Sequence, residues 1–278
     1  MTVGAAEVTA AVREIGGYGL PVGVHASLRS FGGLDDGPAA VIDGVLAAGA
    51  TLLVPSSTFR TCLAPRPSGV SHPFNAEDDG SIPGELPQTW WEPEGTDTDP
   101  AMGALPAAVL RRPGRVRGDH PLSSFTALGP LAADLVAGQR PLDVYAPLRA
   151  LAERDGLVVG MGVGLDTITL LHLAERQAGL RLLRRWARTR DGVVECEHGG
   201  CSRGFERLAG AVAGVETRTR VGSSTWRVWP ARGLLDAASA ALREDPAAAT
   251  CSTPGCRRCQ DLVAAARSPL YVYSSEPQ

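Results

Sequence analysis

The chain has 278 residues, of which 44% are hydrophobic and 21% are charged, and its formal net charge is −3. This composition is typical of a soluble globular protein with a sizeable core, and it argues against a nucleic-acid-binding protein, which normally carries a basic face. No apolar run reaches the roughly 20 residues that cross a bilayer, and the N-terminus lacks the pattern of a secretory signal, which predicts a cytoplasmic protein. All 27 basic residues are arginines, so lysine chemistry such as Schiff-base formation is excluded.

The first part of the chain alternates between helix and strand patterns. Apolar residues at helical spacing predict a helix over 4–16, and Pro38 suits the first turn of a second helix over 38–48. Short buried strands are predicted at 21–25 and 51–55. This order is typical of an α/β sheet with parallel strands.

One long irregular segment interrupts this pattern. Residues 56–100 are rich in Pro, Gly, Ser and acidic residues, which predicts a functional loop or lid at an acceptor site. The later elements are predicted in the order helix 103–112, helix 126–137, strand 156–163 and helix 166–178. We therefore expect one α/β domain over 1–278, with a central mixed, partly parallel sheet, helices on both faces and a small Cys-rich C-terminal subregion at 196–278.

The acidic part of the long loop contains no arginine. Between Pro67 and Leu110 there is no arginine, whereas eight carboxylates fall there, Asp78 and Asp79 among them. Uncompensated negative charge attracts a polycation, so these two aspartates are candidate substrate contacts. A solvated acidic loop without a ligand is the alternative, and the sequence leaves both open.

A glycine-rich turn joins the predicted strand at 156–163 to the next helix. Ligands bind beyond the carboxyl ends of strands in open α/β sheets, and Asp166 is suited to cap the helix there. Thr169, His172 and either Glu175 or Arg176 recur every three or four residues, so they share one helix face. A histidine beside a carboxylate suits general-base chemistry, and a surface His–Glu pair is the alternative.

Two upstream segments carry further candidates. Residues 25–30, HASLRS, directly follow a strand, where backbone N–H groups and an arginine fork suit phosphate oxygens; an ordinary loop with hydroxyl caps is the alternative. Residues 117–121, RGDHP, contain an imidazole whose backbone is biased to an extended conformation by the following proline. His120 is either a second catalytic imidazole or a structural residue that hydrogen-bonds across the cleft.

Three segments, in this order, resemble the aminoglycoside 3-N-acetyltransferase family. Residues 25–30 resemble its HSSL-type stretch, 117–124 its R-S-x-H-P-x-x-S segment, and 166–175 its D-T-x-T-x-L-H-x-A-E segment. Gly118 departs from the pattern, in which a serine is usual. The resemblance implies an acetyl-coenzyme A-dependent enzyme that acetylates an amino group of an aminoglycoside, an antibiotic-resistance activity.

The resemblance also implies roles for individual residues. His172 is expected to be the general base for direct attack by the amine, with Glu175 as its orienting partner and His120 as a second catalytic candidate. Asp166 and Thr169 join the two loop aspartates as candidate substrate contacts. The implied coenzyme contacts are His25, Ser27, Leu28, Arg29, Ser30, Arg117, Ser123 and Phe125.

Other functions stay open at this point. One rival is an acyltransferase of the same family that acts on a biosynthetic amine. Another is a zinc-stabilised binding protein without turnover. A homodimer is also left open.

Five of the six cysteines fall in the last third of the chain, at the spacings C-x4-C and C-x4-C-x2-C. In a cytoplasmic protein C-x2-C favours a metal half-site over a disulfide, so we predict a structural zinc site. Its predicted ligands are Cys201, Cys251, Cys256 and Cys259. Cys196 and His198 are substitutes, free thiols are the alternative, and Cys62 stands apart as a buried or incidental thiol.

Overall fold

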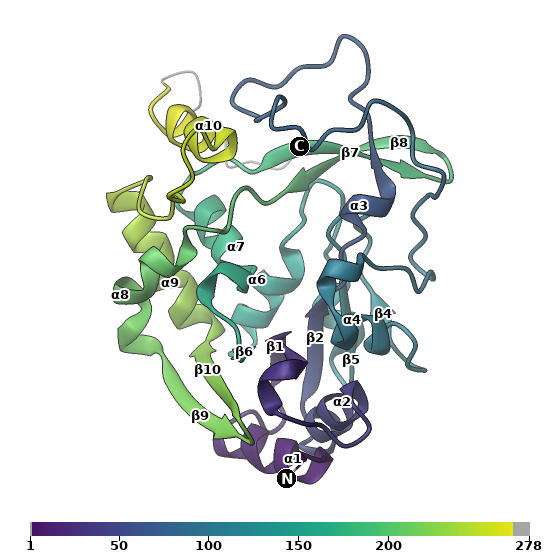
Figure 1. The fold of residues 1–278 in the computed structure, drawn as a ribbon, viewed down its shortest axis with the longest axis vertical. Helices are drawn as coiled ribbons and strands as arrows, with labels where there is room; N and C mark the ends of the chain where they lie inside the picture. The colour runs from purple at the N-terminus through teal and green to yellow at the C-terminus, as the bar shows by residue number, and fades with distance from the viewer. Residues whose placement is uncertain (1, 269–278) are drawn as a thin grey trace.

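A seven-stranded mixed sheet forms the centre of the molecule. In the computed structural model, which describes residues 2–268, its strands follow the order β4-β5-β2-β1-β6-β10-β9 (Figure 1). Strands β2, β1 and β6 are parallel, and the strands on either side of them pair antiparallel. The bounds are β1 Pro21–Ala26, β2 Thr51–Pro55, β4 Val116–Arg117, β5 Phe125–Leu128, β6 Leu157–Met161, β9 Thr217–Val221 and β10 Ser224–Pro230.

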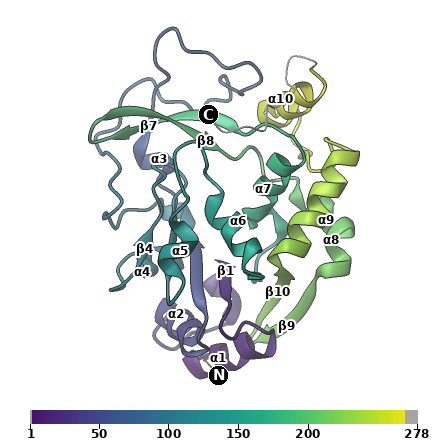
Figure 2. The same cartoon turned by 180° about the vertical axis from the view of Figure 1, so that it is seen from behind.

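Helices cover both faces of this sheet, each through an apolar side. Helices α1, α2 and α4 pack on one face, where Val8, Val41 and Val109 are fully buried. Helices α5, α6, α7 and α9 cover the other face (Figure 2). The bounds are α1 Ala5–Glu14, α2 Pro38–Ala47, α4 Ala104–Val109, α5 Ala132–Val136, α6 Ala146–Glu153, α7 Leu170–Gln177 and α9 Ala231–Glu244. The predicted fold class is confirmed.

Segments far apart in the sequence gather at one end of the molecule. Strand β7 (Leu183–Thr189) forms a hairpin with β8 (Gly192–His198) and also pairs with β3 (Leu63–Ala64) in a second, three-stranded sheet. Helices α3 (Phe59–Cys62) and α10 (Arg257–Ala266) lie at the same end, with the long loop (Figure 1). The loop predicted at 56–100 therefore contains short regular elements.

Two element predictions are wrong in detail. Residues 125–128 form strand β5 instead of the start of a helix, because they pair with β2 and Gly129-Pro130 separates them from α5. The helix predicted from Asp166 begins as a separate 3₁₀ turn, Leu165–Thr167. Asp166 is exposed within that turn, and Thr169 occupies the N-cap position of α7.

The C-terminal third both completes the central sheet and carries a peripheral segment. Strands β9 and β10 and the helices α8 (Ala209–Val212) and α9 follow β8, and Trp226 and Trp229 of β10 are fully buried. Only the last part, ending in α10, lies at the periphery (Figure 1). Residues 269–278 of the predicted subregion lie outside the described residues. None of the helices in the described part combines the length and apolar character that a membrane-spanning helix needs.

Candidate functional site

A cavity of about 250 Å³ opens at the end of β2, beside the start of α7. We call it the His172 cavity. It collects Ser123, Phe125, Thr169 and His172, which the sequence proposed from two separate segments. The full lining is Pro55, Ser57, Met102, Ser123, Ser124, Phe125, Tyr145, Thr169, His172, His198, Gly199, Gly200 and Ser202.

The imidazole of His172 is held by a buried carboxylate. Its Nδ1 lies 2.7 Å from Oε2 of Glu175, and the two side chains are 11% and 3% exposed. Because a carboxylate accepts at Nδ1–H, the lone pair of the neutral ring lies on Nε2. Tyr145 stacks on the ring with centroids 6.0 Å apart, and Phe205 meets it edge-on at 4.8 Å. Arg176, the alternative partner from the sequence, forms ion pairs with other acidic residues.

The backbone approaches the His172 ring closely at Gly199. A methyl group at this position would lie 2.4 Å from the Tyr145 hydroxyl oxygen and 2.6 Å from Cδ2 of His172. Both distances are far below van der Waals contact, so a side chain here would displace one of the rings. Sequence reasoning missed Tyr145 and Gly199; the only signal was the Gly199-Gly200 pair between two cysteines.

His120 is fully buried, and both its ring nitrogens are engaged. Nδ1 accepts hydrogen bonds from the backbone N–H groups of Leu122 at 3.2 Å and Ser123 at 2.8 Å. Nε2 lies 3.0 Å from the carbonyl oxygen of Glu197, to which it donates. Burial lowers the pKa of His120 to about 4, so the ring is neutral at pH 7. This geometry favours the structural role over the catalytic one.

The buried histidines predict a loss of stability in acid. Burial also lowers the pKa of His25 to about 4, whereas the ordinary value for both rings is 6.5. The unfolded chain therefore binds more protons than the folded chain as the pH falls from 6.5 towards 4, and stability falls over that window, by up to about 3 kcal/mol for each ring. His120→Gln keeps a donor for the Glu197 carbonyl. We expect the Tm of this variant to fall less than the Tm of the wild type when the pH is lowered from 7 to 5. An equal loss in both proteins would show that His120 does not titrate there.

The predicted coenzyme segment forms the end of β1 and the turn after it. The backbone N–H of Ser27 donates to the Met161 carbonyl at 2.9 Å, so the turn adjoins the end of β6. The Ser30 hydroxyl contacts the Ser27 carbonyl and the Ser224 hydroxyl, both at 2.7 Å. Arg29 is exposed in the 3₁₀ turn that follows. These residues lie at the carboxyl edge of the parallel strands, where ligands bind in such sheets.

Arg117, in contrast, is buried and ties the long loop to the sheet. Its Nη2 donates to the carbonyls of Ser56 at 2.8 Å and Asp97 at 2.9 Å. Nη1 donates to the Gly95 carbonyl at 3.1 Å, and Nε to the Ser124 hydroxyl at 2.9 Å. Burial lowers the pKa of Arg117 to about 10, which leaves it charged at neutral pH. These contacts argue against the predicted role as a coenzyme phosphate ligand.

The glycine that departs from the family pattern is explained by a neighbouring amide. A methyl group at Gly118 would lie 2.0 Å from Oε1 of Gln139. The buried Gln139 amide accepts from the Phe125 N–H at 3.0 Å and donates to the carbonyls of Ser123 at 3.0 Å and Val144 at 2.7 Å. In this chain Gln139 therefore fills the space beside residue 118 and supports the wall of the His172 cavity.

Several acidic residues of the long loop are paired with arginines, and the arginines that pair with Asp78 and Asp79 come from distant segments. Asp78 pairs with Arg257 at 3.0 Å, and Asp79 pairs with both Arg258 and Arg185. Elsewhere in the stretch Glu77 pairs with Arg66 at 2.8 Å and Glu92 with Arg190 at 2.7 Å. The uncompensated charge expected from the sequence is therefore wrong for Asp78 and Asp79, because the compensating cations come from α10 and β7.

Four cysteine thiols lie together beside α10. The sulfurs of Cys201, Cys251, Cys256 and Cys259 all lie within 4.8 Å of one another, and those of Cys251 and Cys259 are 3.7 Å apart. Tetrahedral zinc with Zn–S bonds of about 2.3 Å requires S···S separations of about 3.8 Å, whereas a disulfide requires about 2.05 Å. The residues present therefore fit a structural zinc ion.

The two substitute ligands lie elsewhere. Cys196 is fully buried in β8, and burial raises the pKa of its thiol well above the ordinary value. His198 lines the His172 cavity, where its Nδ1 lies 3.0 Å from the Ser123 hydroxyl and its ring stacks on Phe59. Cys62 is also buried, 3% exposed in α3.

Comparisons with known proteins agree with this architecture. The chain is 31% identical over 198 residues to aminoglycoside N(3)-acetyltransferase VII of Streptomyces paromomycinus, covering 58% of this chain and 68% of that protein. It is 34% identical over 161 residues to aminoglycoside N(3)-acetyltransferase IV of Salmonella sp, covering 56% and 51%. With aminoglycoside N(3)-acetyltransferase IX of Micromonospora chalcea it shares 42% identity over 97 residues, 34% of each chain. The matches thus span from about a third to about two thirds of the length of these relatives.

Solved structures match over more of the chain. A mutant of aminoglycoside acetyltransferase AAC(3)-IVa in complex with a gentamicin superposes with a TM-score of 0.74 at 25% identity, over 95% of this chain and 98% of that one. Aminoglycoside acetyltransferase AAC(3)-Xa gives a TM-score of 0.70 at 26% identity, over 87% and 93%. A family model described as aminoglycoside 3-N-acetyltransferase matches residues 24–243, most of the chain. The chain therefore belongs to the aminoglycoside 3-N-acetyltransferase family.

Proposed function

We propose that this protein transfers an acetyl group from acetyl-coenzyme A to an amino group of an aminoglycoside-like substrate. The observation that carries the proposal is the His172–Glu175 pair at 2.7 Å, in a cavity at the carboxyl edge of the sheet. Membership of the family supports it, as does the gentamicin bound to a structural neighbour.

In the proposed reaction the amine attacks the thioester directly. The amine nitrogen forms a bond to the acetyl carbonyl carbon while the carbon–sulfur bond breaks, and coenzyme A leaves as its thiolate. Nε2 of His172 takes the proton that the nitrogen sheds, and the Glu175 carboxylate at Nδ1 stabilises the imidazolium that forms. The proton then passes from His172 to the thiolate or to solvent.

The two substrates would approach the cavity from different elements. We expect the coenzyme to lie along residues 25–30, where Arg29 is exposed, with Ser123 and Phe125 towards its acetyl end. Thr169, which lines the cavity one turn before His172, is positioned for the acceptor. Asp166 lies in the exposed 3₁₀ turn outside this lining, so an acceptor would reach it only at the entrance.

Acetyl transfer is tested by following thiol release from acetyl-coenzyme A with a panel of amines. We expect turnover with aminoglycosides and binding of acetyl-coenzyme A alone by calorimetry. If only a small monocationic amine is turned over, the assignment of acetyl-coenzyme A as donor stands. The acceptor would then be the amine of a biosynthetic acyltransferase instead of an aminoglycoside. No coenzyme binding at millimolar concentration would overturn the proposal and favour a binding protein.

We further propose that the four clustered thiols hold one structural zinc ion per chain. Since folding brings Cys201 to the other three, metal binding and local folding are linked. Removing zinc with a chelator is expected to lower Tm by about 5 °C or more. Elemental analysis should find zinc in the wild type and in Cys196→Ser, whose sulfur lies outside the cluster, but little in Cys259→Ser. Protein purified without chelator that held no zinc would contradict the assignment.

A further inference from the structure

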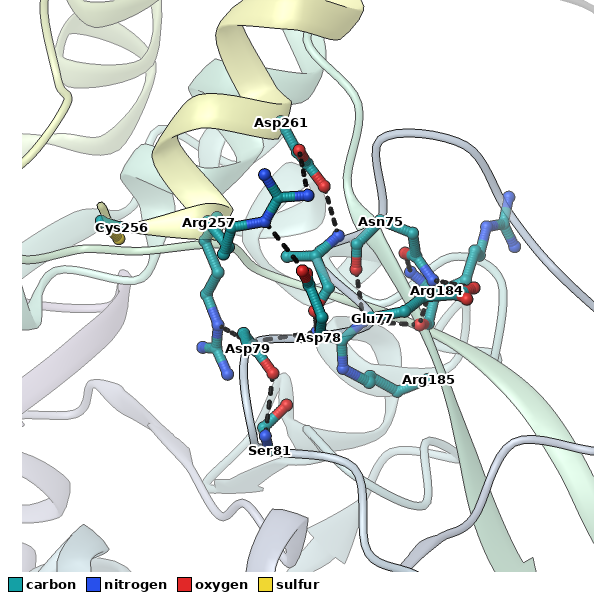
Figure 3. Close-up of polar contacts among 12 residues, drawn as sticks. Asn75, Glu77, Asp78, Asp79, Ser81, Arg184, Arg185, Cys256, Arg257 and Asp261 are labelled. Atoms are coloured by element: carbon teal, nitrogen blue, oxygen red, sulfur yellow. Dashed lines mark hydrogen bonds and ion pairs between the residues drawn. The ribbon is translucent and has the colours of Figure 1, made fainter.

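A short part of the long loop, residues 75–79, is held between β7 and α10 (Figure 3). We call it the clamped segment. On the β7 side, Asn75 is 2% exposed and exchanges two hydrogen bonds with the backbone of Arg184, at 2.6 and 3.1 Å. Nη1 of Arg185 donates to the Asn75 carbonyl at 3.0 Å. These contacts fix one side of the segment to a regular strand.

The other side of the clamped segment is held by α10, although Asp79 also pairs with Arg185 of β7 at 3.4 Å. The contacts are Ala76 N–H to Asp261 Oδ2 at 2.7 Å, Arg257 Nε to Asp78 Oδ1 at 3.0 Å, and the ion pair of Arg258 with Asp79. The Asp79 side chain is 8% exposed. Burial alone would raise the pKa of Asp79, but hydrogen bonds from Ser81 and Arg258 outweigh it and the pKa lies below its ordinary value. The charged carboxylate is therefore stabilised by Ser81 and by its cationic partners Arg258 and Arg185.

Helix α10 has little apolar contact of its own to hold it in place. Its buried residues are Asp261 and Ala265, with Leu262 partly buried against the core. A ten-residue helix with so small an apolar face is not positioned by hydrophobic packing alone. Cys256 at its N-cap and Cys259 in its first turn belong to the cysteine cluster.

The two arginines of α10 that contact the clamped segment are the two residues between these ligands. Arg257 and Arg258 occupy the middle of the C-x2-C motif, so a metal bound to both cysteines fixes the backbone from which both arginines project. Metal occupancy and the position of the loop are therefore connected by a chain of direct contacts.

The clamped segment lines a cavity that adjoins the His172 cavity. Asp78 and Asp79 line a neighbouring cavity of about 620 Å³, together with Gly200 and Ser202. Gly200 and Ser202 also line the His172 cavity, so the two spaces share a wall. Movement of the segment would change the shape of the neighbouring cavity, which shares this wall with the His172 cavity.

We propose that the zinc-bound C-x2-C turn is a positioning device for the acceptor: through Arg257 and Arg258 it holds residues 75–79 in place and so sets the affinity for the amine. The inference rests on the proposed function for its kinetic consequence. In this proposal Asp78 and Asp79 do not contact the acceptor. They anchor the loop, and the position of the loop affects acceptor binding. The coenzyme segment at 25–30 follows a different strand and is unaffected.

The test compares zinc-loaded wild type, zinc-loaded Arg258→Gln and chelated wild type by hydrogen exchange and steady-state kinetics. We expect amide exchange in peptides covering 73–81 to rise about tenfold in the last two, since one charge-assisted hydrogen bond is worth about 1.4 kcal/mol or more. The KM for the acceptor should rise by a similar factor, while kcat and the KM for acetyl-coenzyme A stay within about twofold. Arg258→Lys should restore part of both effects. Arg243→Gln, which removes an exposed charge from α9, is the matched control and should behave as wild type.

Each outcome bears on the proposal in a defined way. Unchanged exchange in 73–81 after complete loss of zinc would overturn the link, as would an equal rise in peptides from β6. An equal rise in the KM for both substrates would overturn the specific role in acceptor binding. If the wild type acetylates no amine, the proposed function fails, but the exchange data still decide whether the metal holds the loop.

Discussion

His172→Ala is expected to lower kcat by roughly two to four orders of magnitude, the usual cost of removing a general base. The reason is geometric: Nδ1 is committed to Glu175 at 2.7 Å, and Nε2 is left to accept the proton of the attacking amine. Glu175→Gln should cost less, because it leaves the base in place and removes only the charge that supports the imidazolium. The kcat of both variants is measured by following thiol release at saturating concentrations of both substrates.

The matched control for this prediction is His72→Ala. His72 belongs to the long loop and pairs with Glu195 of β8 at 2.9 Å. It lies outside the lining of the His172 cavity. It should retain wild-type kcat. Added imidazole should restore part of the activity of His172→Ala but not of Glu175→Gln. A kcat for His172→Ala within about threefold of wild type would exclude the base role, since general-base contributions are far larger.

Gly199→Ala is expected to lower kcat by about 10²-fold, a loss comparable to misplacing a catalytic group by about 1 Å. The added methyl group would meet both the Tyr145 hydroxyl and the His172 ring at less than 3 Å, so the imidazole must turn or the 198–200 segment must shift. Tyr145→Phe in the same protein removes one of the two collisions and should recover part of the loss.

A second glycine-to-alanine substitution tests whether the loss of kcat comes from this collision or from replacing any glycine by alanine. Gly210→Ala in α8 is the control, because a methyl group there has no neighbour within 4 Å among the described residues. It should leave kcat unchanged. Coenzyme binding by Gly199→Ala should stay near wild type, since residues 25–30 are on a different strand. A Gly199→Ala enzyme with full activity would show that the ring tolerates displacement.

Much of the fold and part of the site follow from local patterns. Strand β2 occupies the predicted residues 51–55, since its apolar run is bounded by a proline. The His172–Glu175 contact was expected because residues three apart on a helix share a face. The family was identified from three short segments, and the match over residues 24–243 confirms it. The errors arose where partners are non-local: residues 125–128 form a strand because β2 lies beside them.

The sequence by itself determined the α/β class, the family and the placing of His172 and Glu175 on one helix face, because these follow from short local patterns. It also predicted Cys201, Cys251, Cys256 and Cys259 as one cluster, and their sulfurs lie together in the structure. Only the tertiary structure decided the electrostatics of Asp78 and Asp79, whose partner arginines in α10 lie 179 positions later in the chain. It also decided the contacts of His120, Arg117 and Gly199. A side chain that bonds to a distant carbonyl, or a backbone that passes within contact of a distant ring, leaves no periodic signal in the sequence.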